Sequence, residues 1–311
     1  MWRNVIAFIL SLIAFLGGLS LMRHGMSGMS RGRLIALLKK IAKSPTRGIL
    51  TGTVATAAVQ SSAAITAITV GLVAGENLSF RNGLGIILGS NVGSTITPQL
   101  LTLNLWGIVI PFLIFGILGF ISRRPKFYYP SMALVGFASI FIALEALETS
   151  LRPLTNHSLF IQILSFAGKN TLVAVLAGCL ASALIQSSTA ATVVTMALAA
   201  DGAIGIDGAI AIVLGANIGT CVTSVIAAIG QSRAAKQVAL SHVMLNLVGT
   251  IIFLPLLHPF SLLVTSMTPN VSQQIANAHT IFNLACTIFV WPITAKFAAF
   301  IEKLLPDEVH A

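Results

Sequence analysis

Long apolar runs are the feature that most restricts the fold of this chain. Seven segments are each long enough to cross about 30 Å of hydrocarbon as a helix. They are residues 5–22, 83–101, 105–121, 131–148, 208–229, 238–257 and 279–300. Of the 311 residues 56% are hydrophobic and 8% are charged, which excludes a water-soluble domain of this size. The sequence therefore predicts an all-α polytopic membrane protein with seven spans.

The basic residues predict how these spans are oriented. The net charge of +10 has a topological explanation, so we infer no nucleic-acid partner. Basic residues follow the first, third, fifth and seventh spans: Arg23, Arg31, Arg33, Lys39, Lys40, Lys43 and Arg47; Arg123, Arg124 and Lys126; Arg233 and Lys236; and Lys303. Placing those loops in the cytoplasm leaves Arg3, Arg152 and Lys169 outside. We expect a bacterial cytoplasmic-membrane protein with an external N-terminus and a cytoplasmic C-terminus, whose first run is a span and not a cleaved signal peptide.

Two further apolar segments, 48–75 and 174–200, are interrupted near the middle by Gln-Ser-Ser. Each arm has about 13 residues, or roughly 20 Å of helix, which is too short to cross the bilayer. We expect each segment to form a re-entrant helical hairpin that turns at Gln-Ser-Ser, the first entering from the cytoplasm and the second from outside. Irregular backbone at that depth requires protein or a watery cavity around it.

The second interrupted segment repeats the first with an offset of 126 residues. "VQSSAAITAIT" at 59–69 matches "IQSSTAATVVT" at 185–195, and "LGSNVGSTIT" at 88–97 matches "LGANIGTCVT" at 214–223. Three spans separate corresponding points, so the second copy is expected to be inverted, as in secondary transporters with broken helices. The predicted units are 1–125 and 126–257, with broken helices at 83–101 and 208–229, followed by 258–311 as an external loop, a last span and a tail.

The hairpin tips are suited to bind ions of both signs. A break exposes the N-terminal amides of the following helix, which together with serine hydroxyls attract an anion. Freed carbonyls, the glutamine oxygen and hydroxyl lone pairs can coordinate Na⁺. None of the eight acidic residues lies at a tip, and we expect a bound anion to lack an Arg or Lys partner. Binding of cation and anion together would then be favoured, which predicts symport.

The candidate site residues come from the two copies of the motif. The anion ligands are predicted to be Gln60, Ser61, Ser62, Gln186, Ser187, Ser188 and Thr189. The predicted sodium ligands are Gln60, Ser62, Thr66, Asn91, Ser94, Thr95, Gln186, Ser188, Thr192, Asn217 and Thr220. Two His-x-x-x-Asn pairs are secondary candidates: His242 with Asn246, and His279 with Asn283.

Several of these residues have a second interpretation as helix-packing groups. Hydroxyl and small side chains join helices in lipid, and this alternative stays open for Thr66, Thr69, Thr192 and Thr195, and for both histidines. The Gly-x-x-x-Gly spacings at 89–93 and 215–219 indicate close helix contact. The cysteines Cys179, Cys221 and Cys286 fall in apolar helical stretches, where packing is favoured over disulfide or metal chemistry. No cofactor and no metal other than Na⁺ is expected.

The paired Gln-Ser-Ser hairpins, each followed 31 residues later by the Asn of Gly-x-Asn-x-Gly, resemble the sodium-dependent (type II) phosphate cotransporter family. The resemblance implies Na⁺-driven symport of inorganic phosphate, with both glutamines and all four serines at a shared site. It implies an elevator-like motion of the hairpin-bearing domain, with phosphate, Na⁺ and the lipid bilayer as partners, and leaves a homodimer open. The third motif serine of the family is Ala63 in one copy and Thr189 in the other. Many relatives carry a PhoU-like C-terminal domain, which we do not expect in a chain ending at Ala311.

Other classes of function fit the sequence less well. An intramembrane serine hydrolase needs one nucleophile and one base, and no Gly-x-Ser-x-Gly elbow occurs; we therefore expect no enzyme. A Na⁺- or H⁺-coupled transporter of another small anion stays open. So does an anion channel, because the same helix termini could line a pore.

Overall fold

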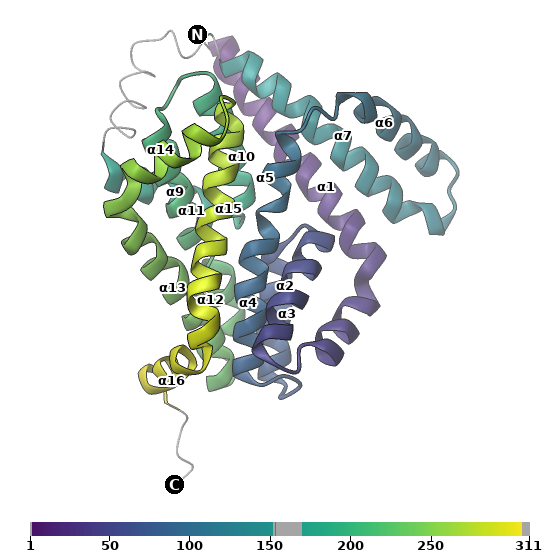
Figure 1. Ribbon diagram of the computed structural model, residues 1–311. Coiled ribbons are helices and arrows are strands. Elements are labelled where there is room, and N and C mark those ends of the chain that lie inside the picture. The colour runs from purple at the N-terminus through teal and green to yellow at the C-terminus, as the bar shows by residue number, and fades with distance from the viewer. Residues whose placement is uncertain (1, 152, 154–169, 307–311) are drawn as a thin grey trace.

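The computed structural model of the chain describes residues 2–151, 153 and 170–306. Regular structure in this part of the chain consists of helices, without strands, which confirms the all-α prediction (Figure 1). Arg152 and Lys169, which were predicted to be external, lie outside the described residues, as do parts of the predicted units 126–257 and 258–311.

Polar caps begin many of the helices. Ser44 accepts from the Arg47 amide at the start of one helix, and Asn270 accepts from the Gln273 amide at the start of another. The helices are α1 Trp2–Ile41, α2 Pro45–Val59, α3 Ser62–Ala74, α4 Phe80–Ser94, α5 Ile96–Leu101, α6 Trp106–Ile121, α7 Pro125–Leu151, α9 Thr171–Ile185, α10 Ser188–Ala200, α11 Ile206–Gly219, α12 Val222–Ala228, α13 Arg233–Phe253, η2 Leu254–Leu256, α14 Leu257–Met267, α15 Val271–Val290, η3 Trp291–Ile293 and α16 Thr294–Leu304.

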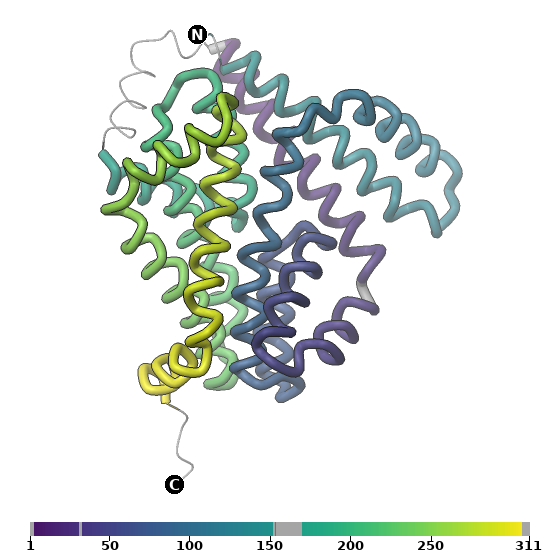
Figure 2. The backbone as a smooth tube through the Cα atoms, in the orientation of Figure 1, coloured from purple at the N-terminus to yellow at the C-terminus, as the bar shows by residue number. Residues whose placement is uncertain are grey.

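The helices form two groups. Helices α1, α6 and α7 pack together on one side, and the remaining helices form a bundle around α4, α11, α13 and α15 (Figures 1 and 2). Helix α1 also contacts α2, and α7 contacts α10. These two helices therefore form the boundary between the groups.

The number of predicted spans is corrected by the structure. Five helical segments in the described residues are long and apolar enough to cross a membrane: Arg3–Ser30, Pro125–Leu151, Ile206–Ala228, Arg233–Met267 and Val271–Leu304. The predicted spans 83–101 and 105–121 belong to one pair of segments bent by 105°, which adds at most one more. By length and composition the described residues thus contain five candidate spans, or six with the bent pair, and not the seven that the apolar runs predicted. Residues 258–267, expected to lie in an external loop, belong to helix α14.

Both interrupted segments consist of two short helices, as predicted. The helices that follow Gln-Ser-Ser, α3 and α10, have 13 residues each. The predicted broken helices are also present, since α4 and α5 are separated at Thr95, and α11 and α12 at 220–221. The arms α2 and α9 pack closely along α4 and α11.

Glycines permit this close packing. A Cβ atom added at Gly89 would overlap the carbonyl oxygen of Ile49 in α2, and one added at Gly215 would overlap that of Val175 in α9. The predicted close contact at the Gly-x-x-x-Gly positions is confirmed. Each hairpin is thereby held on the backbone of a broken helix.

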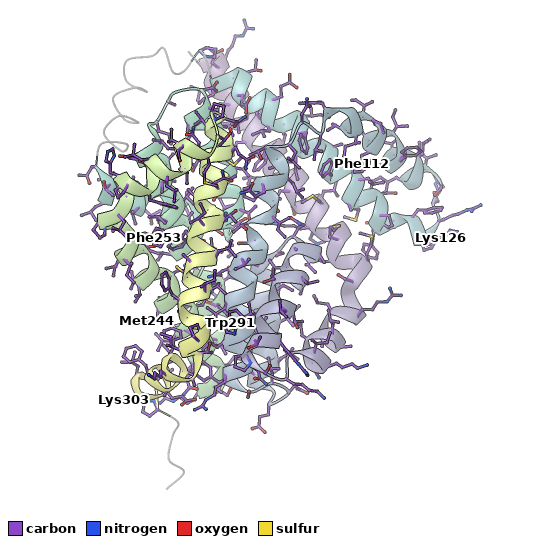
Figure 3. All side chains as sticks on the ribbon, viewed as in Figure 1. Phe112, Lys126, Met244, Phe253, Trp291 and Lys303 are labelled. Carbon is purple, nitrogen blue, oxygen red and sulfur yellow. The ribbon has the colours of Figure 1, made fainter. Side chains whose placement is uncertain are left out.

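Aromatic rings and lysines mark the inner and outer parts of the molecule. Phe253 of α13 packs edge-on against Phe260 of α14 and Phe282 of α15, with ring centroids 5.1 and 5.2 Å away. Lys126 and Lys303 instead extend outward from the molecule, at the start of α7 and in α16 (Figure 3).

Candidate substrate and ion site

Each hairpin turns at its glutamine. Gln60 and Gln186 have positive φ angles of 58° and 55°, in the left-handed region that non-glycine residues rarely adopt. The Gln60 amide is bound by the Thr56 carbonyl oxygen at 2.7 Å, and the Gln186 amide is bound by that of Ser182. Strain of this kind is concentrated at functional sites. The predicted turning points are thus confirmed at both tips.

The serine after each glutamine caps the next helix and leaves amides free for a ligand. Ser61 Oγ accepts from the Ala64 amide at 3.2 Å, and Ser187 Oγ accepts from the Ala190 amide at 3.1 Å. The first two amides of a helix have no partner within the helix. At these tips they belong to Ser62 and Ala63 of α3 and to Ser188 and Thr189 of α10.

Arg23 of α1 joins the two tips. Its Nε donates to the Gln60 carbonyl oxygen at 2.9 Å, and its Nη2 donates to Ser187 Oγ at 2.7 Å. This corrects two expectations: Arg23 lies within the apolar part of α1 and not in a cytoplasmic loop, and an anion at the tips would have a cationic partner. The first apolar run was predicted to end at residue 22, just before Arg23, whereas helix α1 continues to Ile41.

The break between α4 and α5 lies between the tips. On one side of it, the Thr97 hydroxyl donates to Gln60 Oε1. On the other side, Thr189 Oγ1 donates to the Ser94 carbonyl oxygen at 3.2 Å. The structure therefore brings the first hairpin, the second hairpin, the α4–α5 break and Arg23 together.

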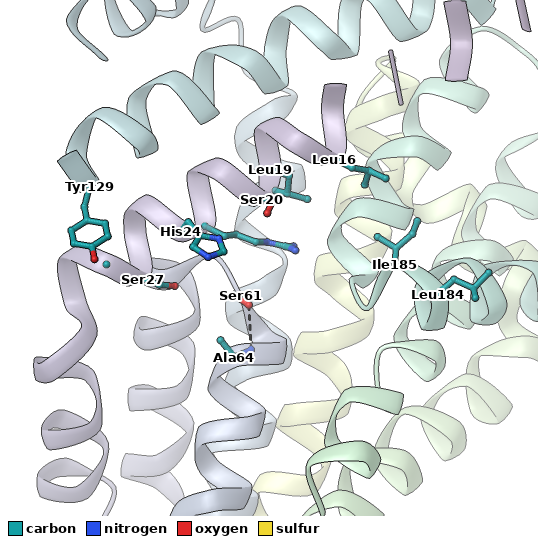
Figure 4. A pocket seen from close by; sticks show the side chains of 12 residues that line it. Leu16, Leu19, Ser20, His24, Ser27, Ser61, Ala64, Tyr129, Leu184 and Ile185 are labelled. Carbon is teal, nitrogen blue, oxygen red and sulfur yellow. Dashed lines mark hydrogen bonds between the residues drawn. The ribbon is translucent and has the colours of Figure 1, made fainter. Parts of the chain in front are cut away.

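A cavity of about 810 Å³ opens beside the tips (Figure 4). Ser61 and Ala64 line it from the first hairpin, and Leu184 and Ile185 from the second. The opposite wall is one face of α1, with Ser20, Arg23, His24 and Ser27, together with Tyr129 of α7. The space is polar at Arg23 and Ser61 and large enough for a small hydrated anion.

The predicted anion ligands differ in how deeply they are buried. Ser187, Ser188 and Thr189 are buried, and Gln60, Ser61 and Ser62 are partly buried. The Gln186 side chain is exposed, whereas Gln60 Nε2 donates to the Ala57 carbonyl oxygen; neither glutamine is among the residues that line the cavity. The two glutamines are therefore equivalent in backbone conformation but not in side-chain environment.

The predicted sodium ligands away from the tips are buried. They are Thr66, Asn91, Ser94, Thr95, Thr192, Asn217 and Thr220. Ser94 Oγ donates to the Asn91 carbonyl oxygen at 2.7 Å, and Thr95 Oγ1 donates to that of Val92 at 2.8 Å. These hydroxyls saturate part of the backbone freed by the break.

The two His-x-x-x-Asn pairs, given as secondary candidates, each reach one motif asparagine. His242 Nε2 lies 3.1 Å from Asn91 Oδ1, and Asn91 Nδ2 donates to Asn246 Oδ1 at 3.3 Å. Asn283 Nδ2 donates to Asn217 Oδ1 at 3.2 Å, while neither ring nitrogen of His279 has a hydrogen-bond partner. All four side chains are buried.

Arg23 and Thr97 were missed by sequence reasoning. A signal for Arg23 exists, since residues 24–30 carry no charged side chain and the helix continues past Arg23 as an uncharged segment. An arginine with uncharged turns on both sides is costly in a membrane unless it has partners there. For Thr97 the sequence carries no comparable signal.

The apolar helices, paired hairpins and shared cavity define a multi-pass membrane transport protein. The chain belongs to the Na⁺/Pi-cotransporter family, whose family model matches residues 14–149 and again residues 143–268. The resemblance seen in the sequence is thereby confirmed. The two matches begin at 14 and 143, close to the 126-residue offset of the repeat.

Relatives cover most of the chain. The protein YqeW of Bacillus subtilis (strain 168) is 31% identical over 269 residues, which are 86% of this chain and 88% of YqeW. The "Putative inorganic phosphate export protein YjbB" of Escherichia coli (strain K12) is 30% identical over 254 residues, 80% of this chain. Its Salmonella typhimurium counterpart is 28% identical over 264 residues, 84% of this chain. The chain spans 46% and 48% of the length of these two YjbB proteins. No solved structure matches.

Proposed function

We propose that this protein is a secondary active transporter that couples the movement of inorganic phosphate to Na⁺ by alternating access. The observation that carries the proposal is the meeting of two helix N-termini and one arginine beside a cavity. Family membership supports phosphate and Na⁺ as the transported ions.

Phosphate fits the donors at the tips. Phosphate binds mainly as a hydrogen-bond acceptor. The site offers it donors of three kinds: helix amides, serine hydroxyls and a guanidinium. Arg23 presents its donors as a planar fork, which suits phosphate better than a point charge does. In this structure the Gln60 carbonyl oxygen and Ser187 Oγ occupy that fork. We propose that phosphate oxygens replace them when substrate binds.

Na⁺ completes the charge balance. Arg23 compensates one negative charge of phosphate, and the remaining negative charge in a site of low dielectric favours an added cation. Carbonyl, hydroxyl and amide oxygens where the helices break can supply neutral ligands for it. The sequence predicted symport because neither ion was expected to have a charged protein partner. With Arg23 at the site, the reason for symport is the negative charge of phosphate that Arg23 leaves uncompensated.

The proposed mechanism is alternating access by two inverted repeats. The hairpins α2–α3 and α9–α10 would open toward opposite sides of the cytoplasmic membrane, with the N-terminus outside. Helices α1, α6 and α7 form a separate group and would act as the scaffold against which the hairpins move in an elevator-like way. The Na⁺ gradient sets the direction toward the cytoplasm in this scheme, although YjbB relatives are named for phosphate export.

Phosphate flux in proteoliposomes tests the proposal. Radiolabelled phosphate uptake is measured with an inward Na⁺ gradient, with K⁺ replacing Na⁺, and with an inward proton gradient. We expect accumulation above equilibrium only with Na⁺. Equal uptake in Na⁺ and K⁺ would refute Na⁺ coupling, and flux that stops at equilibrium under every gradient would indicate an anion channel. If unlabelled sulfate inhibited the uptake of labelled phosphate more strongly than unlabelled phosphate did, another anion would be indicated as the substrate.

A further inference from the structure

The motif asparagines Asn91 and Asn217 occupy equivalent positions in the repeat but have different surroundings. Around Asn91 each polar side chain lies within hydrogen-bond distance of a partner. Asn246 Nδ2 donates to the His242 carbonyl oxygen at 2.9 Å, which turns Asn246 Oδ1 toward Asn91 Nδ2. Asn91 Oδ1 then faces His242 Nε2, so that nitrogen carries the proton, and His242 Nδ1 lies 3.1 Å from Ser224 Oγ. The polar side chains around Asn91 therefore hydrogen-bond to one another.

Around Asn217, whose own Nδ2 donates to the Val213 carbonyl oxygen at 2.8 Å, several neighbouring polar atoms have no partner. Asn283 Nδ2 donates to the His279 carbonyl oxygen at 2.8 Å, the same bond that Asn246 makes. Its Nδ2 also donates to Asn217 Oδ1, so Asn283 Oδ1 points elsewhere and has no partner. Both nitrogens of His279 and the hydroxyl of Thr192 are likewise buried without a hydrogen-bond partner. Unsatisfied buried polar atoms are rare in native proteins, and several on neighbouring helices call for a bound water or ion.

Hydrogen bonds along α15 place these groups at the height of the hairpin tip. Thr287 Oγ1 donates to the Leu88 carbonyl oxygen at 3.2 Å, and Gln99 Nε2 donates to Thr280 Oγ1 at 2.9 Å. Asn283 lies between Thr280 and Thr287 in the sequence of α15, a helix that contacts both α4 and α5. Thr189 of α10 binds the Ser94 carbonyl at that break, and Thr192 lies one turn further along α10. Helices α10, α11 and α15 pack against one another in pairs.

The chemistry of the open groups selects the ligand. Asn283 Oδ1, Thr192 Oγ1 and one imidazole nitrogen can act as neutral acceptors. No cluster of three His, Cys, Asp or Glu side chains suited to a metal ion exists in the described residues, so a divalent or transition metal is not favoured. A monovalent hard cation needs no carboxylate at its site.

We propose that Thr192, Asn217, His279 and Asn283 form a Na⁺ site beside the phosphate cradle, and that the equivalent position around Asn91 is structural and binds no ion. The inference rests on the proposed function in naming Na⁺ as the ion. It makes the repeat functionally asymmetric, with coupling carried by the second copy. Ion binding at this site would bridge α10 to α15 and so link the second hairpin to the bundle.

Thermal unfolding of the purified protein in detergent tests this site without phosphate. The unfolding temperature is measured against NaCl concentration, with KCl holding ionic strength constant. We expect Na⁺ to raise the unfolding temperature of the wild type. Thr192→Val should increase the Na⁺ concentration that gives half of this effect about tenfold, because the variant lacks one ligand. Thr195→Val is the matched control, because Thr195 Oγ1 is already bonded to the Ala191 carbonyl oxygen at 2.8 Å; its Na⁺ response should equal that of the wild type.

A second pair of variants covers the case in which Thr192→Val does not fold. Asn283→Ala should weaken the Na⁺ response, whereas Asn246→Ala should lower the unfolding temperature equally in Na⁺ and K⁺. A wild type equally stable in both salts, or a Thr192→Val or Asn283→Ala variant with the wild-type Na⁺ response, would overturn the site and indicate buried water. Failure of Na⁺-driven phosphate uptake would instead refute the proposed function, because this measurement contains no phosphate.

Discussion

At the scale of single residues, Arg23 determines how the two tips are joined. Its two bonds reach a backbone carbonyl of one hairpin and a hydroxyl of the other. The guanidinium is the only kind of side chain that can serve both acceptors with a fixed planar geometry. The same geometry would let it hold phosphate between the tips.

Substitution of Arg23 should separate charge from geometry. We expect Arg23→Lys to raise the KM for phosphate about tenfold, because lysine keeps the charge but loses the planar fork. Arg23→Gln, which removes the charge, should abolish uptake measured in proteoliposomes. Arg81→Gln is the control: Arg81 is exposed and pairs with Glu302 at 3.3 Å, so uptake should be unchanged. An Arg23→Gln variant with wild-type uptake would show that Arg23 does not bind substrate.

At the scale of helices, close backbone contact between each hairpin and its broken helix positions the tips. The contact depends on glycine at the Gly-x-x-x-Gly positions, where α2 lies on α4 and α9 lies on α11. Small residues are what lets helices approach in lipid, because apolar side chains gain little from leaving it. The tips are therefore placed by packing and not by their own hydrogen bonds alone.

Gly89→Ala should destabilise the protein by about 1–3 kcal/mol, because the new methyl group would overlap the Ile49 carbonyl oxygen and force α2 away from α4. Gly71→Ala in α3 is the matched control, since nothing lies within 4 Å of the added Cβ. It should leave stability unchanged or raise it by about 0.5–1 kcal/mol through helix propensity. Thermal unfolding in detergent measures both. Equal stability of the two variants would contradict the packing role.

At the scale of the whole molecule, the two helix groups meet along the cavity that contains Arg23. One wall is α1 and the other consists of the hairpin tips. In this conformation Ser61 lines the cavity, whereas Ser187 is 3% exposed. Alternating access requires this difference to reverse as the groups move.

Thiol accessibility tests that motion. Ser61→Cys and Ser187→Cys are made separately in a background without Cys179, Cys221 and Cys286, and an impermeant reagent is applied from each side of the membrane. We expect Ser61→Cys to react rapidly in the state seen here and Ser187→Cys to react only after conversion to the other state. Na⁺ and phosphate together should protect both positions more than either ion alone. Full protection by phosphate without Na⁺, or a tip that never responds to substrate, would contradict a shared coupled site.

The sequence by itself determined the class of protein, the hairpin tips and the duplicated motif. These are local properties: apolar length, the polar Gln-Ser-Ser interruptions and a repeated spacing are visible without knowing what any segment contacts. Only the tertiary structure decided which residues meet. Arg23, counted in the sequence among loop cations, contacts both tips because α1 continues as a helix past it. The equal sequence signals of Asn91 and Asn217 likewise have unequal surroundings, because different helices pack against them and the sequence of one segment does not contain its neighbours.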